Sequence, residues 1–265
     1  MQAATRQRFV EDYIRIRHAE GRGSQDASYY LALPYRDLSG RLQEQWTIRA
    51  ASWSHLERRV LPAIERRASR PLRIADLGAG NCWMSYRFAL RGHRPVAIDI
   101  LNDALDGLVA GRHYQPQAPF PRINSEFDCL PLASRSIDLA VFNASIHYST
   151  DYRSTLSEVR RCLVTGGTFL VVDSPVYRRP EHGEAMRRER HQQFAATYGF
   201  ASDSLASIEY FDEPMLATLA RDLGIRWRIH RPWYGLQWAL RPWKAWWKGK
   251  RPPSRFWILE GRFEP

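Results

Sequence analysis

The stretch IADLGAG, residues 74–80, decides the fold: an apolar run ends in a turn with glycines at alternate positions, and a helical pattern follows at once. Gly78 and Gly80 allow a tight turn and let a ligand approach bare backbone beside a helix N-terminus. The next apolar run, PVAID, ends in Asp99, 23 residues beyond Asp76. An acidic side chain at this offset can accept hydrogen bonds from both ribose hydroxyls of a nucleoside. The two strand ends together predict a nucleotide-binding site.

Short apolar runs alternate with helical patterns along most of the chain. Such alternation requires crossover connections, and it predicts an α/β fold with a mostly parallel sheet covered on both faces. An aromatic loop is expected over 29–35. We expect strands near 72–77, 95–99, 122–126, 136–143, 166–173, 225–230 and 255–263, and helices near 5–20, 42–68, 82–91, 103–110, 151–163, 181–198 and 213–223.

The composition restricts the class of protein. Hydrophobic residues make up 44% of the 265 positions, which suits a globular protein with a substantial core and argues against wholesale disorder. Cys82, Cys129 and Cys162 form no CxxC pair and no disulfide framework. No apolar run has the length of a membrane span, and the first residues are charged throughout. We therefore expect a soluble, cytoplasmic protein. No His, Cys or acidic cluster shows metal-ligand spacing, so no metal is expected.

A dinucleotide-binding enzyme is the first alternative. Its fingerprint, GxGxxG, requires a third glycine where this chain has Trp83. An indole at that position opposes the close packing of helix on strand that glycine permits. The sequence therefore disfavours NAD and FAD.

Four further stretches carry a family resemblance: DLGAGNC, AID, SEFDCLPLASRSIDLAVFNASIHY and EVRRCLVTGGTFLVVD, in this order over roughly residues 70–175. In these stretches the chain resembles the class I S-adenosylmethionine-dependent methyltransferases, in particular the type-11 small-molecule group that includes quinone-biosynthesis enzymes. The resemblance implies a Rossmann-like seven-stranded sheet, S-adenosylmethionine as cofactor and methyl transfer as the reaction.

The resemblance also implies roles for the residues at the first two strand ends. Asp76, Gly78 and Gly80 should line the methionine half of the cofactor. Asp99 should hold the ribose hydroxyls, and Ile100 should lie against the adenine ring.

Three further positions are carried over from the same family pattern. Glu126 stands where the family usually has an aspartate contacting the adenine amino group, and Phe127 would offer its backbone N–H to that ring. Asn143 should lie under the sulfonium. Two positions depart from the pattern: Cys82 replaces the third glycine of the family, and Glu126 is one methylene longer than the usual aspartate.

Arg49 lies on the apolar face of the helix expected over 42–68. An arginine on such a face needs a partner or a route to solvent. The cofactor carboxylate could be that partner, bound by the guanidinium fork. The alternative is an arginine that snorkels at the helix edge.

His147 is the candidate catalytic residue. It follows the strand over 136–143, at the sheet edge where ligands of open α/β sheets bind, and it could act as general base if the acceptor must lose a proton. The alternative is a histidine that only packs or forms a local hydrogen bond.

The segment 225–255 holds nine of the Lys and Arg residues, no acidic residue and six of the ten tryptophans. Within it, Trp233, Leu236, Leu240, Trp243 and Trp247 recur at helical spacing, and Pro242 should split the pattern into two short helices. Three interpretations compete: a packed cap over the acceptor pocket, a membrane-interface element, and an RNA-binding surface.

We divide the chain into an N-terminal helical cap, 1–68, and a methyltransferase domain, 69–265, with a basic Trp-rich insertion at 231–254. The expected function is methyl transfer to a small or lipophilic metabolite, with peripheral membrane contact through 233–251 as one interpretation. An RNA-directed methyltransferase and a non-catalytic S-adenosylmethionine-binding protein are the alternatives.

Overall fold

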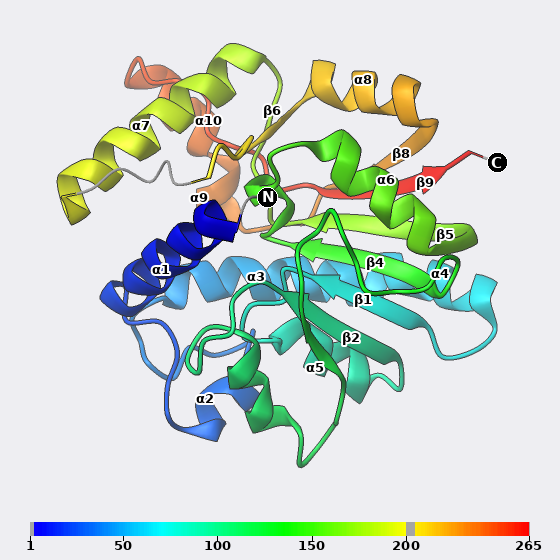
Figure 1. Ribbon diagram of the computed structural model, residues 1–265. Coiled ribbons are helices and arrows are strands. Elements are labelled where there is room, and N and C mark those ends of the chain that lie inside the picture. Colours follow the sequence, from blue (N-terminus) through cyan, green and yellow to red (C-terminus); the bar gives the residue numbers. More distant parts are fainter. Residues whose placement is uncertain (1–2, 200–204, 265) are drawn as a thin grey trace.

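A seven-stranded sheet forms the centre of the computed structural model, which describes residues 3–199 and 205–264 (Figure 1). The strand order is β3-β2-β1-β4-β5-β9-β8, and every neighbouring pair is parallel except the two that include β9. The strands are β1 (Arg73–Leu77), β2 (Arg94–Asp99), β3 (Arg122–Asn124), β4 (Ile137–Asn143), β5 (Leu163–Val172), β8 (Ile225–His230) and β9 (Ile258–Phe263). The predicted Rossmann-like, mostly parallel sheet is confirmed.

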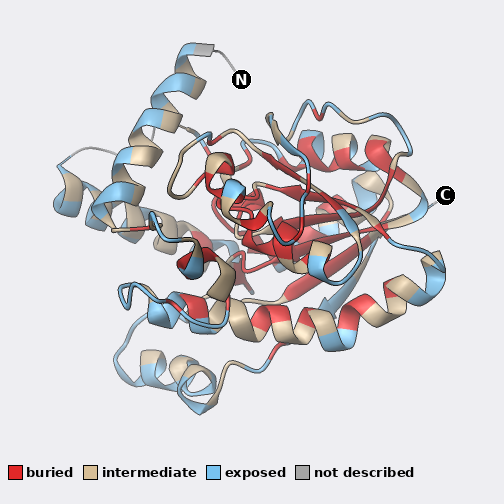
Figure 2. Cartoon of the chain, turned by 90° about the horizontal axis from the view of Figure 1, so that it is seen from below, coloured by how far each residue is buried: buried red, intermediate tan, exposed pale blue. Residues whose placement is uncertain are grey.

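Helices cover both faces of this sheet, and the central strands β1 and β4 and the second half of β5 are buried, whereas the edge strands β3 and β8 are largely exposed (Figure 2). On one face, α3 (Gln43–His55), α4 (Leu61–Ala68) and α5 (Trp83–Leu90) share a core with the sheet, in which Trp46 and Trp53 pack with Ile74 and Leu139. On the other face, α6 (Tyr152–Cys162) and α8 (Glu213–Leu223) pack through Leu156 and similar residues. The helix expected over 42–68 is interrupted by a π-helical turn, Leu56–Val60.

Two local expectations are wrong. The aromatic segment 29–35 is not simply a loop, because α2 (Ala27–Ala32) begins where the Asp26 carboxylate accepts the Ser28 N–H. The segment 103–110 is not an α-helix: the Asp103 carboxylate accepts the N–H groups of Leu105 and Asp106, and only a 3₁₀ helix, Leu108–Tyr114, follows. In both places an aspartate side chain competes for backbone N–H groups and sets the local geometry.

The remaining elements lie at the carboxyl ends of the strands. They are α1 (Ala3–Ala19), α7 (Pro180–Tyr198), the short helix Ile146–Tyr148 and a two-stranded pair, β6 (Val176–Tyr177) with β7 (Phe211–Asp212). This pair of strands was not predicted from the sequence, because a strand of two residues is too short to show an alternating pattern. Asp212 caps α8 through the Met215 N–H, and Gly224 ends it in a left-handed conformation.

The insertion forms two short helices, α9 (Leu236–Ala239) and α10 (Arg241–Trp247), and Pro242 stands at the start of the second. Neither helix has a buried residue, and Trp243, Trp246 and Trp247 are 61%, 74% and 75% exposed. The interpretation as a packed cap is therefore wrong, because the apolar stripe faces outward. Within the described parts of the chain, no helix is both long and apolar enough to cross a membrane.

Candidate functional site

The glycine turn after β1 has the geometry that its sequence predicts. Gly78 and Gly80 have φ angles of 72° and 51°, in the region that glycine favours. A Cβ at Gly78 would lie 2.3 Å from the Cβ of Ser145, so only glycine fits there. Cys82, which replaces the third glycine of the family pattern, also has a positive φ, 66°. The departure at Cys82 therefore preserves the backbone path of the turn.

The carboxylate of Asp99 organises this turn. Its Oδ2 accepts the Gly80 N–H at 2.8 Å, and its Oδ1 accepts the Leu101 N–H at 2.7 Å. The residue also lines the cavity in front of the turn, and burial raises the pKa of its carboxyl. Each oxygen retains a second lone pair, so Asp99 can hold the turn and accept a ligand hydroxyl together.

The cavity brings together most of the predicted binding residues. Its wall includes Arg49, Gly78, Gly80, Asp99, Ile100, Glu126, Phe127 and Asn143. Asp76 and His147 are absent from the wall. Asp76 is buried behind the turn, where it accepts the Ser85 hydroxyl at 2.7 Å.

Three buried oxygens at the ends of neighbouring strands have no hydrogen-bond partner among the described residues. They are Oδ1 of Asp76, Oδ1 of Asn143 and Oδ2 of Asp173, next to the ends of β1, β4 and β5. Unpaired buried acceptors are costly, and they indicate a cationic or hydrogen-bond-donating partner. An ammonium or sulfonium group fits this set.

Arg49 presents the opposite case, a cation without an ion pair. Its guanidinium stands 4.7 Å from the centroid of the Trp46 ring, and it makes no ion pair with the residues that the structure describes. Burial, together with Arg22 and Arg17, lowers the pKa of Arg49 to about 10. A cation held in this way on a cavity wall fits an anionic ligand group better than a side chain that snorkels to solvent.

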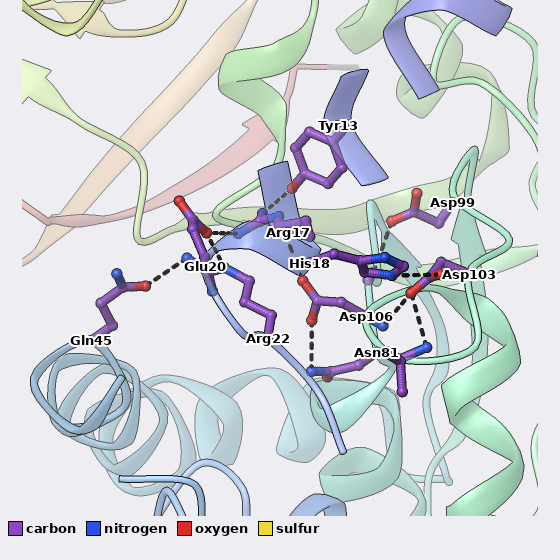
Figure 3. A network of polar contacts seen from close by, with 12 residues as sticks. Tyr13, Arg17, His18, Glu20, Arg22, Gln45, Asn81, Asp99, Asp103 and Asp106 are labelled. Carbon is purple, nitrogen blue, oxygen red and sulfur yellow. Dashed lines mark hydrogen bonds and ion pairs between the residues drawn. The ribbon is translucent and has the colours of Figure 1, made fainter. Parts of the chain in front are cut away.

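Helix α1 closes the cavity with a polar network that sequence analysis missed (Figure 3). Arg17 forms an ion pair with Asp106 at 3.5 Å, and Asp106 accepts the Asn81 amide at 3.2 Å. Arg22 donates to Gln45 at 2.8 Å. These contacts join segments from four parts of the chain, and no local sequence pattern predicts polar contacts between such distant residues.

A second cavity adjoins the first, between α1 and α7. The two share the residues Phe9, Tyr13, Arg17, Arg22, Tyr148 and Leu205. Helix α7 contributes Arg190, Gln193, Phe194, Thr197 and Tyr198 to the second cavity alone. The second cavity is thus lined by aromatic rings from both helices together with charged and polar side chains.

The structure does not bring His147 to either cavity. The residue is buried, its Nδ1 lies 3.3 Å from the Ser174 hydroxyl, and burial lowers its pKa to about 3. Its neighbour Tyr148 lines both cavities instead. The role of His147 as general base stays a prediction. Among the described residues, no group of three His, Cys or acidic side chains could hold a metal ion.

Asp76→Asn is expected to change stability in a pH-dependent way. Burial raises the pKa of Asp76 to about 7, so from about pH 4 to pH 7 the native state holds a proton that the unfolded chain releases. The unliganded protein therefore loses stability as the pH rises through this interval. Asparagine cannot ionise, so thermal melts should show a higher Tm for Asp76→Asn at about pH 8 and little difference at about pH 4.5. An equal Tm difference at both values would contradict the assignment.

Comparisons with known proteins agree with this geometry. The profile of a family described as a methyltransferase domain matches residues 75–171, from β1 to β5. Malonyl-[acyl-carrier protein] O-methyltransferase of Erwinia pyrifoliae is 28% identical over 104 residues, which are 39% of this chain and only 38% of that protein.

Solved structures share the fold. An S-adenosylmethionine-dependent methyltransferase of Mesorhizobium loti has a TM-score of 0.53 at 19% identity, over 76% of this chain and 96% of the other. The 1,6-didemethyltoxoflavin-N1-methyltransferase of Burkholderia thailandensis, solved with 1,6-didemethyltoxoflavin and S-adenosylhomocysteine, has a TM-score of 0.53 at 17% identity, over 90% and 87%. The glycine turn, the seven-stranded sheet and the matching domain lead to one conclusion: residues 75–171 form a methyltransferase domain, and the chain has the fold of S-adenosylmethionine-dependent methyltransferases.

Proposed function

We propose that this chain transfers the methyl group of S-adenosylmethionine to a small or lipophilic metabolite that binds in the second cavity. The observation that carries the proposal is the junction of the two cavities, where Tyr13 and Tyr148 line both. Five aromatic side chains of the second cavity suit a planar acceptor, and charged side chains such as Asp12 and Arg190 are available to its polar groups. Methyl transfer requires donor and acceptor in close, aligned contact, and two adjoining cavities meet that requirement.

In this proposal, different residues of the first cavity bind different parts of the cofactor. Asp99 would accept the ribose hydroxyls, while Ile100, Glu126 and Phe127 would surround the adenine. When bound, the cofactor supplies a methyl group on a positively charged sulfonium, and this group reacts with a nucleophile.

The charges of the site fit the amino-acid half of the cofactor. The unpaired oxygens of Asp76 and Asn143 suit positive charge, and the unpaired guanidinium of Arg49 suits the carboxylate. Arg49 and Asn143 on the cavity wall, with Asp76 buried behind the turn, would thus orient an amino acid whose two ends carry opposite charges.

Proton removal depends on the acceptor. A hydroxyl or amine acceptor must lose a proton, whereas a carboxylate acceptor need not. We keep His147 as the proposed base for the first case. Because its side chain lines neither cavity, it would have to act through Tyr148, which lines both and whose ring lies at a centroid distance of 4.5 Å. Two similar proteins are named as a malonyl-[acyl-carrier protein] O-methyltransferase and as a 1,6-didemethyltoxoflavin-N1-methyltransferase, and the second name supports a small acceptor.

The acceptor can be identified by labelling. Metabolite extracts incubated with methyl-labelled donor and the wild-type protein should yield a labelled small molecule that is absent with Asp99→Ala. Labelled RNA or no labelled product with any extract would contradict the proposal.

Phe194→Ala tests the second cavity once the acceptor is known. Removing the ring should raise the KM for the acceptor about 10-fold, because burial of such a side chain contributes about 1.5 kcal/mol or more. Gln192, an exposed residue of the same helix outside the cavity wall, provides the matched control as Gln192→Ala. The affinity for S-adenosylmethionine should be unchanged in both variants. An unchanged KM for Phe194→Ala would place the acceptor elsewhere.

A further inference from the structure

The exposed face of α9 and α10 combines tryptophans with cations. Trp233, Leu236, Leu240, Trp243, Trp246 and Trp247 are between 47% and 75% exposed, the largest group of exposed apolar side chains among the described residues. Monomeric proteins rarely expose such a patch without a binding function. We call these residues, with Lys244, Lys248 and Lys250, the tryptophan patch.

The charge of the patch is positive and unneutralised. Lys244, Lys248 and Lys250 are exposed and take part in none of the ion pairs that the described residues form. No acidic residue lies anywhere between 225 and 255. A second copy of the chain would bring like charges together across a two-fold interface, so self-association through the patch is disfavoured.

We propose that the tryptophan patch docks on an anionic lipid bilayer. Indole rings are favoured at the interface between headgroups and acyl chains, and lysines are attracted to anionic headgroups. A single-stranded nucleic acid binds where aromatic rings stack on its bases along a basic groove. Here leucines and tryptophans share the exposed stripe of two short helices, which suits shallow insertion into lipid.

The patch is connected to the wall of the second cavity. Arg251, which follows α10, forms an ion pair with Glu189 of α7 at 2.7 Å, so the end of the insertion lies against α7 (Figure 1). The next residue of α7, Arg190, lines the second cavity. A docked protein would therefore hold this cavity near the bilayer, where a lipophilic acceptor dissolves. This last step rests on the proposed function, whereas the docking itself does not.

Vesicle flotation tests the docking with the full chain. The wild type should float with vesicles of phosphatidylcholine containing phosphatidylglycerol, and much less with phosphatidylcholine alone or at high salt. The variant Lys244→Glu, Lys248→Glu, Lys250→Glu should bind the anionic vesicles about 100-fold more weakly. The variant Trp243→Ala, Trp246→Ala, Trp247→Ala should bind at least about 10-fold more weakly.

A control variant separates local docking from net charge. Arg58→Glu, Arg59→Glu, Arg66→Glu changes the charge equally on the exposed side of the π-helical turn Leu56–Val60 and of α4, and it should float like the wild type. Calorimetry should show unchanged S-adenosylmethionine binding in all three variants, so failure of the docking and failure of the proposed function remain distinguishable. Equal flotation of all variants, or retention on RNA without flotation, would overturn the proposal.

Discussion

Asp99→Ala is expected to weaken S-adenosylmethionine binding by about 100-fold, because several charge-assisted hydrogen bonds of about 1.5–3 kcal/mol each depend on this carboxylate. Two of them hold the turn itself, through the N–H groups of Gly80 and Leu101. Others would be made by the ribose hydroxyls. Without the carboxylate, both the preformed turn and the ribose contacts are lost. Isothermal titration calorimetry measures the effect directly.

Asp99→Asn provides the graded comparison for this prediction. The amide keeps one acceptor oxygen and the shape of the side chain, so its affinity should fall between those of the wild type and Asp99→Ala. Asp222→Ala removes an exposed carboxylate on α8 and should bind like the wild type. If Asp99→Ala retained full affinity, the carboxylate would only cap the turn, and the adenosyl site would lie elsewhere.

Arg49→Met is expected to act in opposite directions on stability and on binding. The unliganded protein should gain about 1–2 kcal/mol of unfolding free energy, because a partly buried cation without an ion pair is replaced by an apolar side chain of similar length. Its affinity for S-adenosylmethionine should fall about 10- to 100-fold through loss of the carboxylate contact. Chemical denaturation and calorimetry measure the two effects.

Arg49→Lys refines this second prediction. Lysine keeps the charge but not the bidentate fork, so it should restore only part of the affinity. Arg36, an exposed arginine in the loop after α2, serves as a control through Arg36→Met, which should leave both quantities near the wild-type values. Loss of stability in Arg49→Met together with unchanged binding would indicate a snorkelling side chain instead.

The sheet could be predicted from the sequence because the signals for its strands are local. Neighbouring residues alone show three of these signals: a strand that ends in glycines, an acidic residue at the end of the next strand, and apolar runs of the length of a strand. Most predicted binding residues lie on one cavity wall for the same reason: they follow strand ends, and parallel strands bring their carboxyl ends to one edge.

The remaining features depend on partners distant in the sequence. Arg17 meets Asp106 across 89 positions, and Tyr148 faces Tyr13 across 135. His147 shows what the order of the strands cannot predict. Its position after β4 places it near the site, but its side chain points toward Ser174. The position of a residue after a strand predicts its neighbourhood, whereas the direction of its side chain follows from packing.

Helix α1 has a consequence for ligand exchange. None of its residues from Ala4 to Ala19 is fully buried, and several of its contacts with the sheet side are polar. Arg6 donates to Asn124, and His18 contacts Asp103 (Figure 3). A helix held mainly by polar contacts can separate locally from the core, and this opening costs only a fraction of the free energy of global unfolding. Exchange of amide hydrogens in α1 should therefore be faster than in α3, and the rate at which ligands leave should follow the rate of this local opening.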